Sequence, residues 1–124
     1  MDIRVLIADP ERELLDAYRD YLIGQGFDVE TASSGRDCVN KLRSIRPDCL
    51  VLEPDMADGW GDRILEAACA ERPAIPVLVL SRQDAGPVDH RVCKFHVKPV
   101  SMIELAGSIR KAAAQGEADI HQTF

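Results

Sequence analysis

Four polar side chains stand where apolar, strand-like runs of the sequence end. Asp9 follows one run, Glu53 and Ser81 end two more, and Lys98 ends a fourth in front of a proline. Hard divalent cations prefer carboxylate ligands, whereas a hydroxyl and an ammonium suit the oxygens of a phosphoryl group. These residue types therefore indicate a site that handles phosphate and a divalent cation, provided that the fold brings the ends of the four runs together.

The apolar runs themselves predict five β-strands. Three of them, at residues 5–8, 49–52 and 77–80, are apolar throughout, which is typical of strands that are covered on both faces at the centre of a parallel sheet. The expected strands span residues 3–8, 27–32, 49–53, 77–81 and 93–98.

Amphipathic segments between these runs predict four helices. The first carries apolar residues at helical spacing over residues 14–22, and we expect Asp9 to be its N-cap and Pro10 to lie in its first turn. Ser34 and Ser101 each open a capping box, which indicates the start of the second and the last helix. The third helix follows from apolar residues at 64, 65, 68 and 69.

Strand and helix alternate along the whole chain, which predicts a doubly wound α/β fold with right-handed crossovers. In such a sheet, ligand sites lie beyond the C-terminal ends of the central strands. The fourth crossover, residues 82–92, contains Gly86-Pro87 and few apolar residues, so we expect a shortened helix of at most two turns there. We expect one domain over residues 1–114 and a polar tail or the start of a linker over residues 115–124.

Composition excludes several classes of function. The chain has 15 Lys and Arg against 21 Asp and Glu, and this net charge of −6 disfavours direct binding of nucleic acid. No apolar run approaches the ~18 to 20 residues that span a bilayer, and the N-terminus lacks the pattern of a signal peptide. We therefore expect a cytoplasmic protein with no membrane contact.

The cysteines and histidines show no metal-ligand spacing. Each cysteine lies in or beside an apolar stretch, which favours buried thiols in a reducing compartment. His96 alternates with its neighbours as a solvent-facing strand residue would, and we assign it no chemistry. The cysteines are Cys38, Cys49, Cys69 and Cys93.

The chain resembles the receiver domain of bacterial two-component response regulators from Asp2 to about Ala114. The resemblance is carried, in order, by IRVLIAD at residues 3–9, PDCLVL at 47–52, PVLVLS at 76–81 and VKP at 97–99. It implies a flavodoxin-like, five-stranded parallel sheet of order 2-1-3-4-5. It also implies a histidine kinase or an output domain as protein partner, an aspartate at the end of the third strand that accepts a phosphoryl group, and Mg²⁺ held by acids after the first strand.

The sequence departs from this family at the residues that would do the chemistry. Glu53 stands at the position of the phosphoacceptor aspartate, and its extra methylene moves the carboxylate outward by about 1.5 Å. A misplacement of ~1 Å can cost ~100-fold in rate. Pro10 stands where the family has a metal-binding acid. Ser81 and Lys98 match the family's hydroxyl and lysine, and Phe95 takes the place of its switch aromatic without a phenol oxygen.

The favoured interpretation is an atypical receiver that is not an enzyme and acts as a phosphorylation-independent protein-interaction module. Glu53 would keep a negative charge close to Lys98 and so resemble, in part, a phosphorylated aspartate. In a plainer version of this interpretation, Glu53 only neutralises a remaining lysine and the domain does not switch. No cofactor is then expected, and whether the domain dimerises stays open because the segment between Ser81 and Phe95 is short.

Two alternatives retain phosphoryl chemistry. A receiver with residual magnesium-dependent phosphoacceptor activity would use an acidic pocket of Asp9, Glu11, Glu53 and Asp55, with Mg²⁺ bound weakly at Asp9, Glu53 and Asp55. A phosphatase of the haloacid dehalogenase type would use Asp9 as nucleophile, although Glu11 stands where that family needs a second aspartate. Trp60, in a glycine-rich loop, is either a partner contact or the anchor of the third helix.

Overall fold

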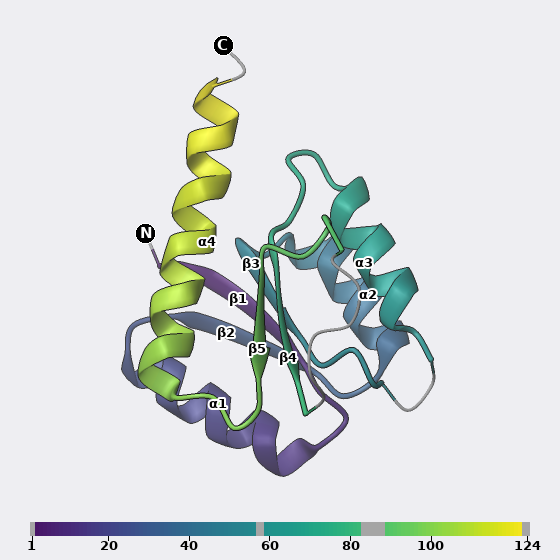
Figure 1. The fold of residues 1–124 in the computed structure, drawn as a ribbon, viewed down its shortest axis with the longest axis vertical. Coiled ribbons are helices and arrows are strands. Elements are labelled where there is room, and N and C mark those ends of the chain that lie inside the picture. Colours follow the sequence, from purple (N-terminus) through teal and green to yellow (C-terminus); the bar gives the residue numbers. More distant parts are fainter. Residues whose placement is uncertain (1, 57–58, 83–88, 123–124) are drawn as a thin grey trace.

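A computed structural model describes residues 2–56, 59–82 and 89–122, and they form a three-layer α/β fold (Figure 1). Five parallel strands make one sheet in the order β2-β1-β3-β4-β5. The fold class and strand order predicted above are therefore confirmed. The strands are β1 (Arg4–Ala8), β2 (Asp28–Ala32), β3 (Cys49–Leu52), β4 (Val77–Ser81) and β5 (Lys94–Val97).

Helices cover both faces of the sheet (Figure 1). Helices α1 (Arg12–Gly24) and α4 (Met102–Gln122) pack on one face, and α2 (Gly35–Ile45) and α3 (Gly61–Ala70) pack on the other. Successive residues of a central strand point to opposite faces, so Val51 packs with α1 and α4 whereas Leu52 packs with α2 and α3. This double cover explains why three strands are apolar throughout.

The local signals at the starts of α2 and α4 are confirmed. The Ser34 hydroxyl accepts a hydrogen bond from the Asp37 backbone N–H at 3.2 Å, and the Ser101 hydroxyl accepts one from the Glu104 N–H at 3.4 Å. Each bond satisfies one of the backbone donors that a helix leaves unpaired in its first turn.

The predicted start of α1 is wrong. The helix begins at Arg12, and its N-cap residue is Glu11, whose side chain makes no capping bond. Asp9 instead accepts a hydrogen bond at Oδ1 from the Glu11 backbone N–H at 2.9 Å, which closes a turn in front of the helix. Asp9 is therefore part of the strand-end turn, and Pro10 lies outside the helix.

The segment between β4 and β5 is short, and its described residues, 82 and 89–93, contain no helix. Arg91 donates to carboxylates of Asp89 and of Asp62 in α3, both at 2.8 Å, and these ion pairs fasten the segment to the α3 side of the fold. The short helix expected in this crossover otherwise falls on residues 83–88, which lie outside the described residues.

His96 was expected to face solvent, and this prediction is wrong. The His96 side chain is buried, and Nε2 lies 3.0 Å from the hydroxyl of Ser108 in α4. Val97, the next residue of β5, is exposed at 46% of its full exposure. Alternation along an edge strand indicates two faces but does not say which one a helix covers, and here α4 covers the face of His96.

The cysteine prediction holds for only two residues. Cys38 and Cys49 are buried, and burial raises the pKa of the Cys38 thiol to about 12. Cys69 and Cys93 are exposed. Cys69 lies in the last turn of α3, off the stripe that packs on the sheet, and Cys93 precedes β5.

Helix α4 is longer than expected. It continues to Gln122 and passes beyond the edge of the sheet at which the strands begin, as Figure 1 shows. Among the α4 side chains that the structure describes, which end at Gln115, the last buried one is Ala112, and the two alanines that follow it favour helix. Within the described part of the chain, no helix is both long and apolar enough to cross a membrane.

Candidate functional site

The C-terminal edge of the sheet brings together three of the four strand-end residues singled out in the sequence. The Lys98 ammonium lies 2.8 Å from Asp9 Oδ2 and 3.0 Å from Glu53 Oε2. The exposed fractions of the three side chains are 8% for Lys98, 3% for Asp9 and 7% for Glu53. We call these three residues the acid-lysine cluster.

Backbone hydrogen bonds just past the strands position the cluster. The Asp9 N–H donates to the Ala32 carbonyl at 3.1 Å, and the Glu53 N–H donates to the Ala8 carbonyl at 2.9 Å. The Lys98 N–H donates to the Ser81 carbonyl at 2.7 Å. Each charged residue therefore continues the hydrogen-bonding of the strand before it, so the register of the sheet fixes where its side chain starts.

All four carboxylate oxygens of the cluster face a donor. Asp9 Oδ1 accepts from the Glu11 N–H, and Glu53 Oε1 accepts from the Asp55 N–H at 3.2 Å. The other two oxygens face Lys98, although the contact of Glu53 Oε2 is an ion pair without well-oriented hydrogen-bond geometry. Two carboxylates share one ammonium, so the cluster carries a net charge of about −1.

The electrostatics of the pocket keep Lys98 charged. Burial by itself lowers the pKa of Lys98, but the hydrogen bond to Asp9, the close contact with Glu53 and the charges of both carboxylates outweigh it, and the pKa lies above its ordinary value. The charges of the cluster also act on Tyr18 of α1. Burial raises the pKa of the Tyr18 phenol, the Lys98 charge lowers this pKa, and the charges of the neighbouring carboxylates raise it. The net shift is upward, so the Tyr18 phenol stays protonated at neutral pH.

Beside the cluster, an ion pair links the residue that follows β4 to the residue that precedes α1. The guanidinium of Arg82 binds the carboxylate of Glu11. Next to it, a hollow of about 430 Å³ is lined by Tyr18, Arg82, Lys98 and the loop that follows β5. The sequence did not indicate a role in this site for Tyr18 or Arg82. Tyr18 belongs to the apolar stripe of its helix, and Glu11, the partner of Arg82, is 71 residues away in the chain.

The residues of this pocket do not fit a preformed Mg²⁺ site. Lys98 occupies the space between the two buried carboxylates, Glu11 is turned to Arg82, and Pro10 has no side-chain oxygen. Asp55 is exposed, and only its backbone N–H contacts the cluster. Among the described residues, no group of three His, Cys, Asp or Glu side chains is arranged to hold a metal ion. A cation that bound between the Oδ2 atom of Asp9 and the Oε2 atom of Glu53 would compete with the Lys98 ammonium.

The other residues named from the sequence lie around the cluster. Ser81 is buried at the end of β4, in register with Val97 of β5. Phe95 is half-buried and packs against the core on the α2 and α3 side. Trp60 precedes α3 and packs on the same core, with the Arg63 guanidinium 4.9 Å from its ring centroid, so the structure favours the anchor interpretation for Trp60.

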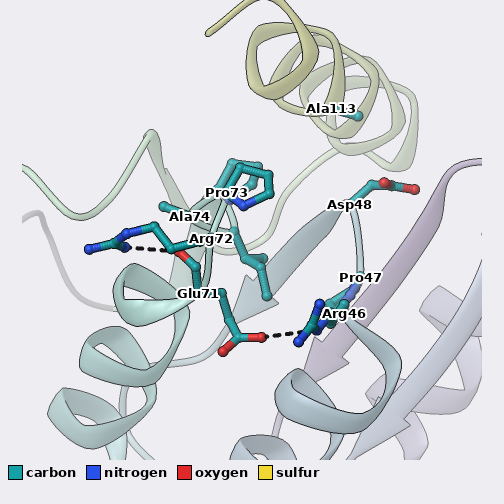
Figure 2. A pocket seen from close by; sticks show the side chains of 10 residues that line it. Arg46, Pro47, Asp48, Glu71, Arg72, Pro73, Ala74 and Ala113 are labelled. Carbon is teal, nitrogen blue, oxygen red and sulfur yellow. Dashed lines mark hydrogen bonds and ion pairs between the residues drawn. The ribbon is translucent and has the colours of Figure 1, made fainter. Parts of the chain in front are cut away.

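A second pocket, of about 250 Å³, lies at the opposite edge of the sheet, where the strands begin (Figure 2). Its walls are the loops after α2 and α3 and one turn of α4 at Ala113. Arg46 pairs with Glu71 at 3.6 Å, Arg72 donates to the carbonyl oxygens of Cys69 and Glu71 at 3.0 Å, and the Asp48 carboxylate accepts from the Arg4 backbone N–H at 2.9 Å. The pocket thus holds the cationic Arg46 and Arg72 together with the acidic Asp48 and Glu71, so its lining has no net excess of either charge.

Comparison with protein families gives a match that covers most of the chain. The family model described as "Response regulator receiver domain" matches residues 5–110. Among curated proteins, Response regulator MprA of Mycolicibacterium vanbaalenii is 29% identical over 115 residues, which is 89% of this chain and 50% of that protein. The probable transcriptional regulatory protein TcrX of Mycobacterium tuberculosis is 30% identical over 115 residues, 87% of this chain and 48% of that protein. The chain thus spans about half the length of these relatives.

Solved structures agree on the fold. The CheY-like response regulator receiver domain protein from Methanospirillum hungatei superimposes with a TM-score of 0.88 at 20% identity, covering 96% of this chain and 99% of that one. The signal receiver domain of a putative LuxO repressor protein from Vibrio parahaemolyticus gives a TM-score of 0.83 at 19% identity, covering 96% and 95%. At such low identity these likenesses concern the fold alone.

Proposed function

The chain belongs to the response regulator receiver domain family, and from this premise we propose that it is a receiver that signals without being phosphorylated, as a protein-interaction module. Receiver domains are signalling domains of two-component systems rather than typical enzymes, and they interact with kinases and output domains. We propose that this domain binds such a protein partner in the cytoplasm and catalyses no reaction of its own.

The observation that carries the proposal is the state of Lys98. Its ammonium already bridges Asp9 and Glu53, and the cluster has one more negative charge than positive. A phosphorylated carboxyl group carries a charge of about −1.5 to −2 at neutral pH, in place of the −1 of the carboxylate from which it forms. Phosphorylation would therefore add repulsion to a buried, already negative cluster, and Pro10 has no side-chain oxygen that could help bind a compensating cation.

Glu53 supplies part of what a phosphorylated aspartate would supply. One of its oxygens faces the Lys98 ammonium at 3.0 Å and the other accepts the Asp55 N–H at 3.2 Å. A carboxylate offers two oxygens and one charge, whereas a phosphoryl group offers three oxygens and nearly two charges. We propose that this partial likeness holds the domain in one signalling state permanently.

Mass spectrometry of the intact protein tests the absence of phosphorylation. With a small phosphodonor and Mg²⁺, we expect no phosphoryl adduct. Glu53→Asp alone should also stay unlabelled, because Pro10 still withholds a metal ligand, whereas Glu53→Asp combined with Pro10→Asp should be labelled. A magnesium-dependent adduct on Glu53 of the unmodified protein would favour residual phosphoacceptor activity instead, and an adduct on Asp9 would favour the phosphatase alternative.

A second measurement tests whether the charge of Glu53 sets the state. Amide chemical shifts should change in Glu53→Gln at Ser81 and along β5, where Lys98 would lose one of its two partners. The matched control is Asp55→Asn, which removes an exposed carboxylate at the same edge and should leave those shifts alone. The charge of Glu53 does not set the state if Glu53→Gln changes these chemical shifts no more than the control does and if a protein partner co-purified with the domain binds the variant equally well. Glu53 would then only neutralise Lys98, and the domain would not switch.

A further inference from the structure

A cavity separate from the acid-lysine cluster lies between α4 and the sheet at β4 and β5. Its volume is about 200 Å³, and its floor is formed by Leu78 and Ala112. The polar side chains around it are Lys94 of β5 and Ser108, Lys111 and Gln115 of α4. We call it the lysine hollow.

The lysine hollow carries positive charge without a carboxylate. Lys94 and Lys111 are exposed, and in the part of the chain that the structure describes neither forms an ion pair. No Asp or Glu whose side chain the structure describes lines the cavity. In a chain of net charge −6, two ammonium groups beside one small cavity make a local site where an anion is favoured.

A buried hydroxyl forms one wall of the hollow. Ser108 is 8% exposed, and its Oγ lies 3.0 Å from His96 Nε2. Burial lowers the pKa of His96 and the Lys94 charge lowers it further, while Glu104 opposes them, so the ring is neutral at neutral pH. When Nε2 carries the ring proton it donates to Ser108 Oγ, and the hydroxyl proton of Ser108 is then available to a ligand in the hollow.

We propose that the lysine hollow binds a small oxyanion with the chemistry of phosphate, held by Lys94, Lys111 and the Ser108 hydroxyl. Charge-assisted hydrogen bonds from two ammonium groups favour a dianion with several oxygens over a spherical halide. The cavity is large enough for a phosphate group and a few waters, and it is smaller than the ~300 to 1,000 Å³ of pockets that enclose drug-sized ligands. Because the donors come from β5 and from α4, the bound anion ties this helix to the edge strand.

The test is an NMR titration with inorganic phosphate at pH 7, in which sodium chloride is withdrawn to keep the ionic strength constant. We expect saturable shifts of the Lys94, Ser108 and Lys111 amides and of the His96 ring, with half-saturation on the order of millimolar because both lysines are exposed. Glycerol 3-phosphate is the second arm: equal binding identifies a site for any phosphomonoester, and binding of inorganic phosphate alone identifies a site for the free ion. Hydrogen exchange of α4 amides should slow in the presence of ligand.

Substitutions distinguish phosphate binding in the lysine hollow from a general effect of salt on the charges of the protein. Lys94→Gln and Lys111→Gln should each weaken binding by roughly tenfold, as loss of one charge-assisted hydrogen bond implies. Arg36→Gln, which removes an exposed cation from α2 on the other face of the sheet, should leave binding unchanged. Shifts that fail to saturate, that chloride reproduces, or that survive both lysine substitutions would overturn the proposal.

Discussion

Replacing Lys98 by methionine should destabilise this domain more than any exposed charge substitution. Methionine keeps a similar aliphatic stem but removes the ammonium that lies within 3.0 Å of both Asp9 and Glu53. The two carboxylates would then face each other in a pocket where neither is more than 7% exposed. The two carboxylates would stay buried but would lose the ammonium that neutralises part of their charge.

The expected magnitude follows from the burial of the cluster. Breaking a buried ion pair by removing one partner costs about 3 to 5 kcal/mol, which is a large part of the ~5 to 15 kcal/mol that stabilises a typical domain. With a urea slope of about 1 to 3 kcal/mol per molar, the midpoint of unfolding should fall by more than about 1 M. The double variant Lys98→Met with Glu53→Gln should recover part of this loss, because it leaves only one unpaired carboxylate.

Urea unfolding followed by Trp60 fluorescence measures both effects. The matched control is Arg46→Met, because Arg46 is 76% exposed and its ion pair with Glu71 should contribute less than about 1 kcal/mol. The reasoning is refuted if Lys98→Met loses less than about 1 kcal/mol, or if the double variant is less stable than Lys98→Met alone.

Two further predictions concern buried titratable groups. Alkylation of the folded protein at pH 8 should modify Cys69 and Cys93 readily and Cys38 and Cys49 only on unfolding, because burial raises the pKa of both buried thiols; peptide mass spectrometry reads this out, and equal rates would contradict the packing. The lowered pKa of His96 means that the unfolded chain binds its proton more readily, so the stability that the neutral, buried ring contributes is present above about pH 6.5 and lost as the pH falls below it. His96→Gln should flatten this dependence in unfolding curves measured between pH 5 and 8, and an unchanged slope would show that His96 does not contribute to it.

The order and type of the elements could be predicted because they depend on local patterns. Continuous apolar runs predicted the central strands, and Ser34 and Ser101 predicted two helix starts, since a cap and a covered strand each depend on residues that are adjacent in sequence. The same kind of reasoning failed where two local roles compete. Asp9 suits both a helix cap and a strand-end turn. In the structure the Asp9 N–H donates to the Ala32 carbonyl and so continues the pairing of β1 with β2, and Asp9 therefore forms the turn after the strand.

Which face of an element is covered could not be predicted from its own sequence. His96 and Val97 alternate in β5 as they would in either orientation, and only the packing of α4 buries His96 and exposes Val97. Cys69 is likewise apolar enough for a core position, but it lies in the last turn of α3, beyond the face that packs on the sheet.

By itself, the sequence determined the chemical inventory of the site: the carboxyl groups of Asp9 and Glu53, the ammonium of Lys98 and a proline at residue 10. Only the tertiary structure decided what these residues do to one another. Residues 9, 53 and 98 are far apart in the chain and meet because parallel strands end at one edge of the sheet. Their distances show one ammonium shared by two buried carboxylates, a Coulombic relation that no local pattern encodes because it joins residues from three separate strand ends.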